Sequence, residues 1–206
     1  MDKKNTLLLT VIAIATLLVA VVGATFAYFS AQTGEGASAP VTVTTSTADS
    51  LEYGSFGAIT INATQQNFYE GAGSLSGETT GNVTLKANND NSASYCYTAI
   101  LNVAQNDFVY TTEAHTPELL FSINKNSTAI MTDYDVTVAT AGAINIPTVT
   151  GGSEMVHKIT AGAGATVSDS WNARVVLVNL ETDQQDNTNK QFVATLNFTS
   201  VECPTS

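Results

Sequence analysis

The stretch WNARVVLVNL, residues Trp171–Leu180, decides the fold class of this chain. Apolar side chains occupy both alternating sets of positions, so both faces of an extended strand would be apolar here. Such a strand lies in the middle of a sheet or is covered on both sides. We expect a central strand at this position, with Trp171 in the core rather than stacked on a sugar ring.

Other strands are expected from shorter runs in which apolar and polar residues alternate. The alternation is clearest at Tyr134, Val136 and Val138, which predicts a half-buried strand there. No helical period of 3.6 residues is sustained beyond residue 30. We therefore expect one all-β sandwich of about nine strands. The further expected strands are Val41–Thr45, Ala58–Ala63, Asn82–Ala87, Tyr95–Ala104, Leu119–Asn124, Glu154–Thr160 and Gln191–Val201.

Three polar or glycine-rich stretches are expected to be loops. Gly71–Gly81 and Gly142–Gly152 contain the small residues that favour turns. Asp183–Asn189 has the oxygen-rich composition of a calcium site, but it lacks the spacing and the terminal Glu of a known calcium loop. We interpret this third stretch as a solvated turn.

The composition excludes several classes of function. The chain has 206 residues, of which 44% are hydrophobic and 12% are charged, and its formal net charge is −11. This length suits one domain with a substantial core, and the apolar content is too high for a disordered chain. A strongly acidic chain lacks the clustered Lys and Arg that nucleic acids and anionic lipids require. We expect no nucleic-acid partner.

The N-terminus has the three parts of an export signal. Lys3 and Lys4 give a positive start, Leu7–Val22 is an apolar run, and small residues follow it. Small side chains stand one and three residues before a possible cut, so that the mature chain would begin immediately after residue 27. The residues of this expected cleavage site are Thr25, Ala27 and Tyr28.

An uncleaved membrane anchor is the alternative. Residues 7–29 are long enough to span a bilayer, since about 20 apolar residues suffice. The length favours the anchor, whereas the small residues favour cleavage, and we adopt cleavage. The expected organisation is a signal peptide (or uncleaved anchor) at 1–27, a flexible lead at 28–47 and a β-sandwich at 48–206.

The chain has two cysteines, Cys96 and Cys203, and an even number in an exported chain indicates a disulfide. Each cysteine falls on the side of its expected strand opposite to the more apolar set of residues. Both can therefore lie on the same kind of surface, as a cross-strand bridge requires. Two free thiols are the alternative.

No recognised catalytic or metal-binding motif is present. The two histidines, His115 and His157, have no His or Cys at the spacing of metal ligands, and no HExxH or Gly-x-Ser-x-Gly occurs. A Ser-His-Asp triad is a spatial arrangement that a sequence does not reveal. We expect a protein that is not an enzyme and that carries no cofactor and no metal.

The end of the export signal, Thr25-Phe26-Ala27-Tyr28-Phe29-Ser30, resembles the signal and mature start of the TasA/camelysin family. These are exported proteins of Gram-positive bacteria that a dedicated signal peptidase of the SipW type processes. Two further stretches agree with the family, a lead followed by a Thr/Val strand and an amide-rich turn before the last strand. They are Gly36–Val43 and Asn187–Phe192, the latter continuing to Leu196–Phe198.

The resemblance implies a jelly-roll sandwich that is secreted and assembles into extracellular fibres of a biofilm matrix. In that family the mature N-terminus of one subunit completes a sheet of the next, so the chain's main partner would be another copy of itself. The candidate donor segment is Tyr28–Thr45, with Tyr28, Phe29, Val41 and Val43 as its anchoring residues. Camelysin-type members have been linked to metalloprotease activity, which is not carried over because HExxH is absent.

A different class of function remains open beside this one. The same exported fold would suit a surface binding module or adhesin that recognises a glycan or a host protein. Such a module would contact the membrane only through residues 7–29, if these are uncleaved. In either case we expect the folded part outside the cell, on the cell surface or in a biofilm matrix.

Overall fold

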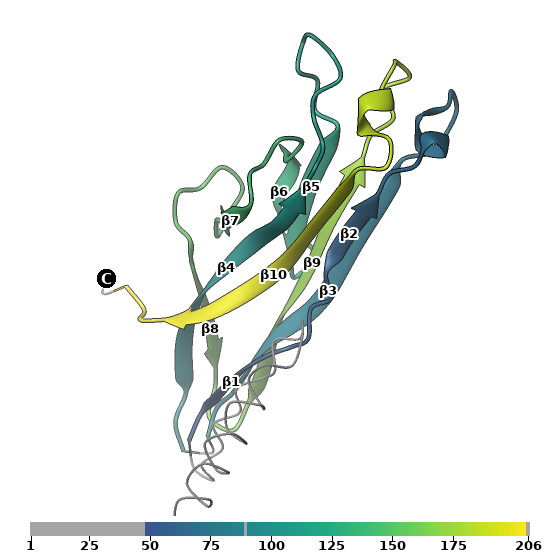
Figure 1. Ribbon diagram of the computed structural model, residues 1–206. Coiled ribbons are helices and arrows are strands. Elements are labelled where there is room, and N and C mark those ends of the chain that lie inside the picture. The colour runs from purple at the N-terminus through teal and green to yellow at the C-terminus, as the bar shows by residue number, and fades with distance from the viewer. Residues whose placement is uncertain (1–47, 89, 205–206) are drawn as a thin grey trace, which may run out of the picture. The chain divides into compact units, whose positions relative to one another are not determined.

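The computed structural model describes residues 48–88 and 90–204, which belong to one compact unit (Figure 1). In this part of the chain no helix is long and apolar enough to cross a membrane. The predicted signal, lead and Val41–Thr45 strand lie outside the described residues. The strands are β1 (Ser50–Tyr53), β2 (Ile59–Asn62), β3 (Leu75–Lys86), β4 (Ala93–Asn106), β5 (Leu119–Lys125), β6 (Thr128–Asp135), β7 (Gly142–Ile146), β8 (Val156–Ala161), β9 (Thr166–Leu177) and β10 (Gln191–Val201).

These strands form two antiparallel sheets, which confirms the all-β sandwich. One sheet has the order β1-β3-β9-β5-β6, and the other has the order β2-β10-β4-β7. Strand β8 pairs with β4 at Ala93–Thr98 and β7 pairs with it at Ala99–Val103, so these two short strands lie end to end along the same edge. The β10-β4 sheet lies in front of the β9 sheet in Figure 1.

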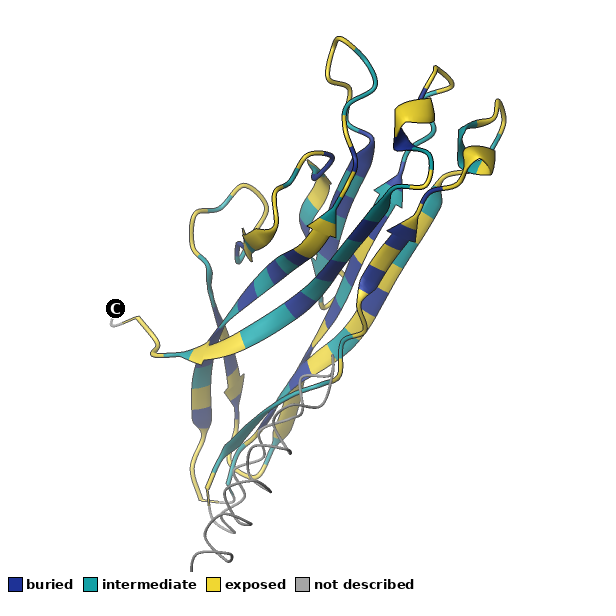
Figure 2. Cartoon of the chain, viewed as in Figure 1, coloured by how far each residue is buried: buried dark blue, intermediate teal, exposed yellow. Residues whose placement is uncertain are grey.

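The core lies between the two sheets, and buried and exposed residues alternate along the strands (Figure 2). Trp171–Leu177 form the second part of β9, which pairs with β3 on one side and with β5 on the other, whereas Val178–Leu180 follow the strand. The predicted central strand is therefore confirmed. Trp171 itself is 2% exposed and belongs to the core, as expected.

Both glycine-rich stretches that were predicted to be loops contain strands. β3 begins at Leu75 and β7 begins at Gly142. In β3 a glycine serves close packing, because a Cβ at Gly77 would lie 2.7 Å from the backbone oxygen of Thr60 in β2. Glycine is thus required here by the approach of a second backbone, not by a turn.

The predicted alternation at Tyr134, Val136 and Val138 is wrong. β6 ends at Asp135, and Asp133 has a positive φ of 49°, which breaks the regular extended backbone. Val136 is buried, whereas Tyr134 is 47% and Val138 is 49% exposed. The strand itself begins earlier than predicted, at Thr128.

One sheet is incomplete along part of β10. Strand β2 pairs only with Gln191–Ala194, and the chain before β2 belongs to the other sheet as β1. From Thr195 to Val201, β10 pairs with β4 on one side, and no described residue pairs with its other side. We call Thr195–Val201 the open β10 edge.

Aromatic side chains fill the space between β1 and the open β10 edge. Phe198 of β10 has its ring 6.1 Å from that of Tyr53 and 4.8 Å from that of Phe56. Phe56 in turn lies against β3 at Gly81, where an added Cβ would come within 2.6 Å of the ring. Glycine at position 81 therefore leaves room for the Phe56 ring to pack between β3 and Phe198.

Gly81→Ala is expected to destabilise the domain by about 1–3 kcal/mol, because the new methyl group displaces Phe56 from a packed site. Urea unfolding followed by tryptophan fluorescence measures the change. Gly73→Ala is the matched control, since a Cβ there meets nothing within 4 Å. Equal stability of the two variants would contradict this role of Gly81.

Candidate functional site

A lysine and an aspartate interrupt the core face of two neighbouring strands. Lys125 is the last residue of β5 and lies opposite Trp171 of β9 in the strand register. Asp169 lies two residues before Trp171, so all three side chains belong to the same face of the sheet. The Lys125 and Asp169 side chains are only 16% and 10% exposed.

Three donors surround the Asp169 carboxylate. Its Oδ2 lies 2.9 Å from Nζ of Lys125 and accepts a 2.6 Å hydrogen bond from the hydroxyl group of Tyr97. Its Oδ1 accepts a 2.8 Å hydrogen bond from Nδ2 of Asn126. Tyr97 comes from β4 in the opposite sheet, so this group joins the two sheets. Burying a carboxylate is costly unless it is paired in this way.

The turn between β5 and β6 positions one of these donors. Asn126 and Ser127 form a two-residue turn with φ values of 50° and 64°, a backbone conformation in which Asn is common. Oδ1 of Asn126 accepts a 2.8 Å hydrogen bond from the backbone N–H of Ser170. The amide is thereby held with its Nδ2 toward Asp169.

Aromatic rings enclose the ion pair. Nζ of Lys125 lies 5.4 Å from the ring centre of Tyr97 and 5.6 Å from that of Trp171. The imidazole of His157, from β8, lies 5.5 Å from the Tyr97 ring and 4.9 Å from the Trp171 ring. We refer to Tyr97, Lys125, Asn126, His157, Asp169 and Trp171 together as the Asp169 cluster.

Burial sets the protonation of two members of this cluster. The pKa of His157 is lowered to about 4. Desolvation is the larger cause, and the positive charge of Lys125 is the next. Desolvation and the neighbouring Asp169 raise the pKa of the Tyr97 hydroxyl group well above its usual range. At neutral pH the imidazole is therefore uncharged and the phenol keeps its proton.

Stability is expected to depend on His157 in acid. Its pKa rises from about 4 in the folded chain to an ordinary value of 6.5 when unfolded. Because the unfolded chain binds the extra proton, the free energy of unfolding falls as the pH drops from 6.5 toward 4. His157→Phe should reduce this slope in urea titrations at several pH values. His115→Asn, at an exposed site, is the control, and an unchanged slope in His157→Phe would contradict the assignment.

A second buried carboxylate, Glu118, lies just before β5 and has only neutral donors around it. Its Oε1 accepts hydrogen bonds of 2.7 Å from both the backbone N–H and the hydroxyl group of Thr111. Its Oε2 accepts hydrogen bonds from Nε2 of Gln184 at 2.6 Å and Nδ2 of Asn187 at 2.8 Å. This network joins the β4–β5 and β9–β10 loops, which lie side by side in Figure 1.

The predicted solvated turn at Asp183–Asn189 is therefore wrong in part. Gln184 and Asn187 are fully buried, because their amides serve Glu118 and nearby backbone groups. The described residues contain no group of three or more His, Cys, Asp or Glu side chains that could hold a metal ion.

Glu118→Gln is expected to destabilise the domain by about 1.5–3 kcal/mol. Each oxygen of Glu118 accepts two hydrogen bonds, so the N–H₂ group that replaces one oxygen would face two donors and could accept from neither. The free energy of unfolding in urea gives the measurement. Glu113→Gln removes an exposed charge from the same loop and should change little. If both variants lose the same stability, charge alone and not the network is responsible.

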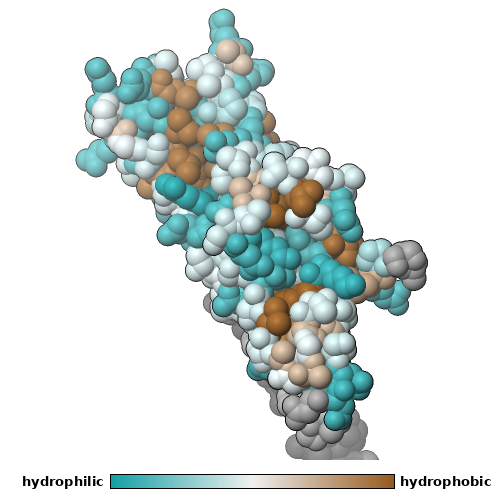
Figure 3. Space-filling view, turned by 180° about the vertical axis from the view of Figure 1, so that it is seen from behind, coloured by the Kyte–Doolittle hydropathy of each residue, from teal (hydrophilic) through white to brown (hydrophobic). Residues whose placement is uncertain are grey.

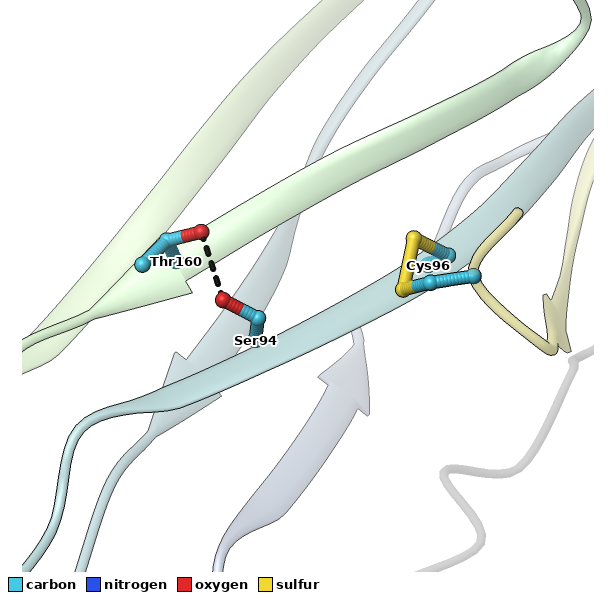
Figure 4. The surroundings of a disulfide bond; sticks show 4 residues. Ser94, Cys96 and Thr160 are labelled. Carbon is cyan, nitrogen blue, oxygen red and sulfur yellow. Dashed lines mark hydrogen bonds between the residues drawn. A yellow bond between two sulfur atoms is a disulfide. The ribbon is translucent and has the colours of Figure 1, made fainter. Parts of the chain in front are cut away.

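The predicted disulfide between Cys96 and Cys203 is present (Figure 4). It joins β4 to the chain just after β10, where Val201 lies opposite Cys96 in the register. Ser94 lies on the same strand and shares a hydrogen bond of 2.9 Å with Thr160 of β8. The bridge thus fastens the end of the open β10 edge to β4.

The cleavage-site residues and the four donor-segment residues lie outside the described residues. His115 stacks on Tyr110 at the surface, whereas His157 is buried in the Asp169 cluster, so the two histidines form no common site. Sequence reasoning missed Lys125 and Asp169, although each continues the core-facing set of its strand.

Comparisons with known proteins do not assign the chain to a family. A scan against models of protein families found no match, and a search of curated proteins found no significant match.

Proposed function

We propose that this chain is a secreted structural subunit that polymerises into extracellular fibres by strand addition. Residues 28–45 of one copy would pair with the open β10 edge of the next. The observation that carries the proposal is this edge, since an unpaired strand edge inside a sandwich offers backbone groups to an incoming chain. The contact is head-to-tail and can therefore propagate.

The size and lining of the edge support a donor of this kind. A strand lying along Thr195–Val201 would run for roughly 24 Å, well within the reach of the 28–45 segment. Beside the edge, the half-buried rings of Tyr53, Phe56 and Phe198 offer an apolar surface. Alternate residues such as Val41 and Val43 would pack against it.

A second copy suits the edge better than the same copy does. The first described strand after the lead, Ser50–Tyr53, pairs with β3 in the other sheet. The lead of the same copy is joined to this strand through residues 48 and 49 only. The lead of another copy has no such constraint.

The strand order supports assigning the sandwich to the jelly rolls. The orders β3-β9-β5-β6 and β2-β10-β4-β7 alternate strands from the two halves of the chain, as a doubled Greek key requires. Strand β1 then extends the first sheet beyond this arrangement, and β8 lies end to end with β7.

The proposal is tested with a mature chain that lacks residues 28–45. It should remain folded by circular dichroism and sediment as a monomer, while the intact mature chain forms large assemblies. A synthetic peptide of residues 28–45 should bind the shortened chain, and the same peptide with Val41→Asp and Val43→Asp should not. Hydrogen exchange should slow at Thr195–Val201 on assembly. Fibres formed by the shortened chain would overturn the proposal.

A surface binding module is the second candidate, and one groove favours it. A shallow groove of about 580 Å³ crosses the outer face of β3, β9 and β5. Figure 3 views the molecule from the side of this sheet, where hydrophobic patches are separated by hydrophilic and neutral surface. Uncharged hydroxyl and amide groups suit a neutral polyhydroxyl ligand such as a glycan. They belong to Thr80, Asn82, Asn124, Ser127, Ser170 and Asn172.

A further inference from the structure

The Asp169 cluster holds a lysine and an aspartate in direct contact in a largely buried place. Lys125 and Asp169 lie on adjacent strands, face the same side of the sheet and bring Nζ to 2.9 Å from Oδ2. We propose that the two side chains become joined by an amide bond between Nζ of Lys125 and Cγ of Asp169, with release of one water molecule. The bond would form whether or not the chain polymerises.

The reaction balances without any external reagent. A proton passes from the Lys125 ammonium group to Oδ2 of Asp169, which gives a neutral amine and a carboxylic acid. The amine nitrogen then attacks Cγ and forms the new N–C bond. The C–Oδ2 bond breaks, and Oδ2 leaves as water with the second proton from the nitrogen. Nothing is oxidised or reduced, and both charges disappear.

Two neighbouring groups are placed to assist the two oxygens of Asp169. Nδ2 of Asn126 donates to Oδ1, the oxygen that carries the negative charge in the tetrahedral intermediate and becomes the amide carbonyl. The Tyr97 hydroxyl group donates to Oδ2, the oxygen that leaves, and can relay the second proton from the lysine nitrogen to it. Each oxygen therefore already has the donor that its part in the reaction requires.

The surroundings favour the product over the ion pair. The Tyr97 and Trp171 rings enclose the lysine nitrogen, and the aspartate side chain is 10% exposed. A buried ion pair retains a large desolvation cost, which a neutral amide does not have. Because the fold already holds the two groups in contact, their reaction avoids the entropy loss of a bimolecular encounter. Limited access of water slows hydrolysis of the bond.

The chain contains an internal control for this chemistry. Lys86 and Glu52 form an ion pair at 2.8 Å, but their side chains are 53% and 31% exposed. No aromatic ring is stacked on Lys86 in the described part of the chain, and water competes for both partners. If proximity were sufficient, Lys86 and Glu52 would become linked as well. If burial among aromatic rings is required, only Lys125 and Asp169 become linked.

The test is the intact mass of the exported protein after reduction of the disulfide. The mass is expected to be lower than that of the mature sequence by one water molecule. Tandem mass spectrometry of a digest should find the peptide that contains Lys125 linked to the one that contains Asp169. A protein of full sequence mass would overturn the proposal, as would a water loss located within a single unlinked peptide, for example at a cyclised aspartate.

Variants distinguish the parts played by individual residues. Lys125→Arg and Asp169→Ala should each restore the full mass, while Lys86→Arg should retain the loss of one water molecule. Tyr97→Phe and Asn126→Ala should lower the fraction of linked chains when samples are taken at early times after synthesis. If both of these variants are linked as fast as the unaltered chain, the proposed assistance is wrong. Loss of the bond in Lys86→Arg would contradict the assignment of the linked lysine.

Discussion

The pairing of β10 with β4 is the constraint on which the rest of the sandwich depends. β4 accepts β10 along one edge and both β7 and β8 along the other, whereas β2 covers only the first residues of β10. Within the described residues, side chains and not a strand lie beside the open β10 edge. Tyr53, Phe56 and Phe198 form the apolar surface beside this edge, and the disulfide secures the end of the edge.

Local patterns predicted the strands that have regular alternation. β10 occupies Gln191–Val201 as expected, because Phe192, Ala194 and Leu196 repeat every second residue without a break. The pattern failed where backbone conformation changes within a strand, as at Asp133, and where glycine serves packing rather than a turn, as at Gly77. Such departures arise from neighbouring strands that a local window does not contain.

The buried polar groups were even harder to predict from local sequence patterns. Glu118 takes its partners Gln184 and Asn187 from 66 and 69 residues away, and Tyr97 reaches Asp169 across 72 residues. The sequence does mark Lys125 and Asp169 as charged residues in core-facing positions. What it lacks is the register that places β5 beside β9, and only that register brings the two charges together.

The disulfide also divides the chain topologically. Cys96 and Cys203 are 107 positions apart, so β5 to β10 all lie within one covalently closed ring, while β1, β2 and β3 lie outside it. A protease that cuts any loop within the ring leaves two fragments still joined through sulfur, so the nicked molecule does not separate without reduction. A cut in the connection between β2 and β3 instead frees the N-terminal piece from every covalent link to the remainder.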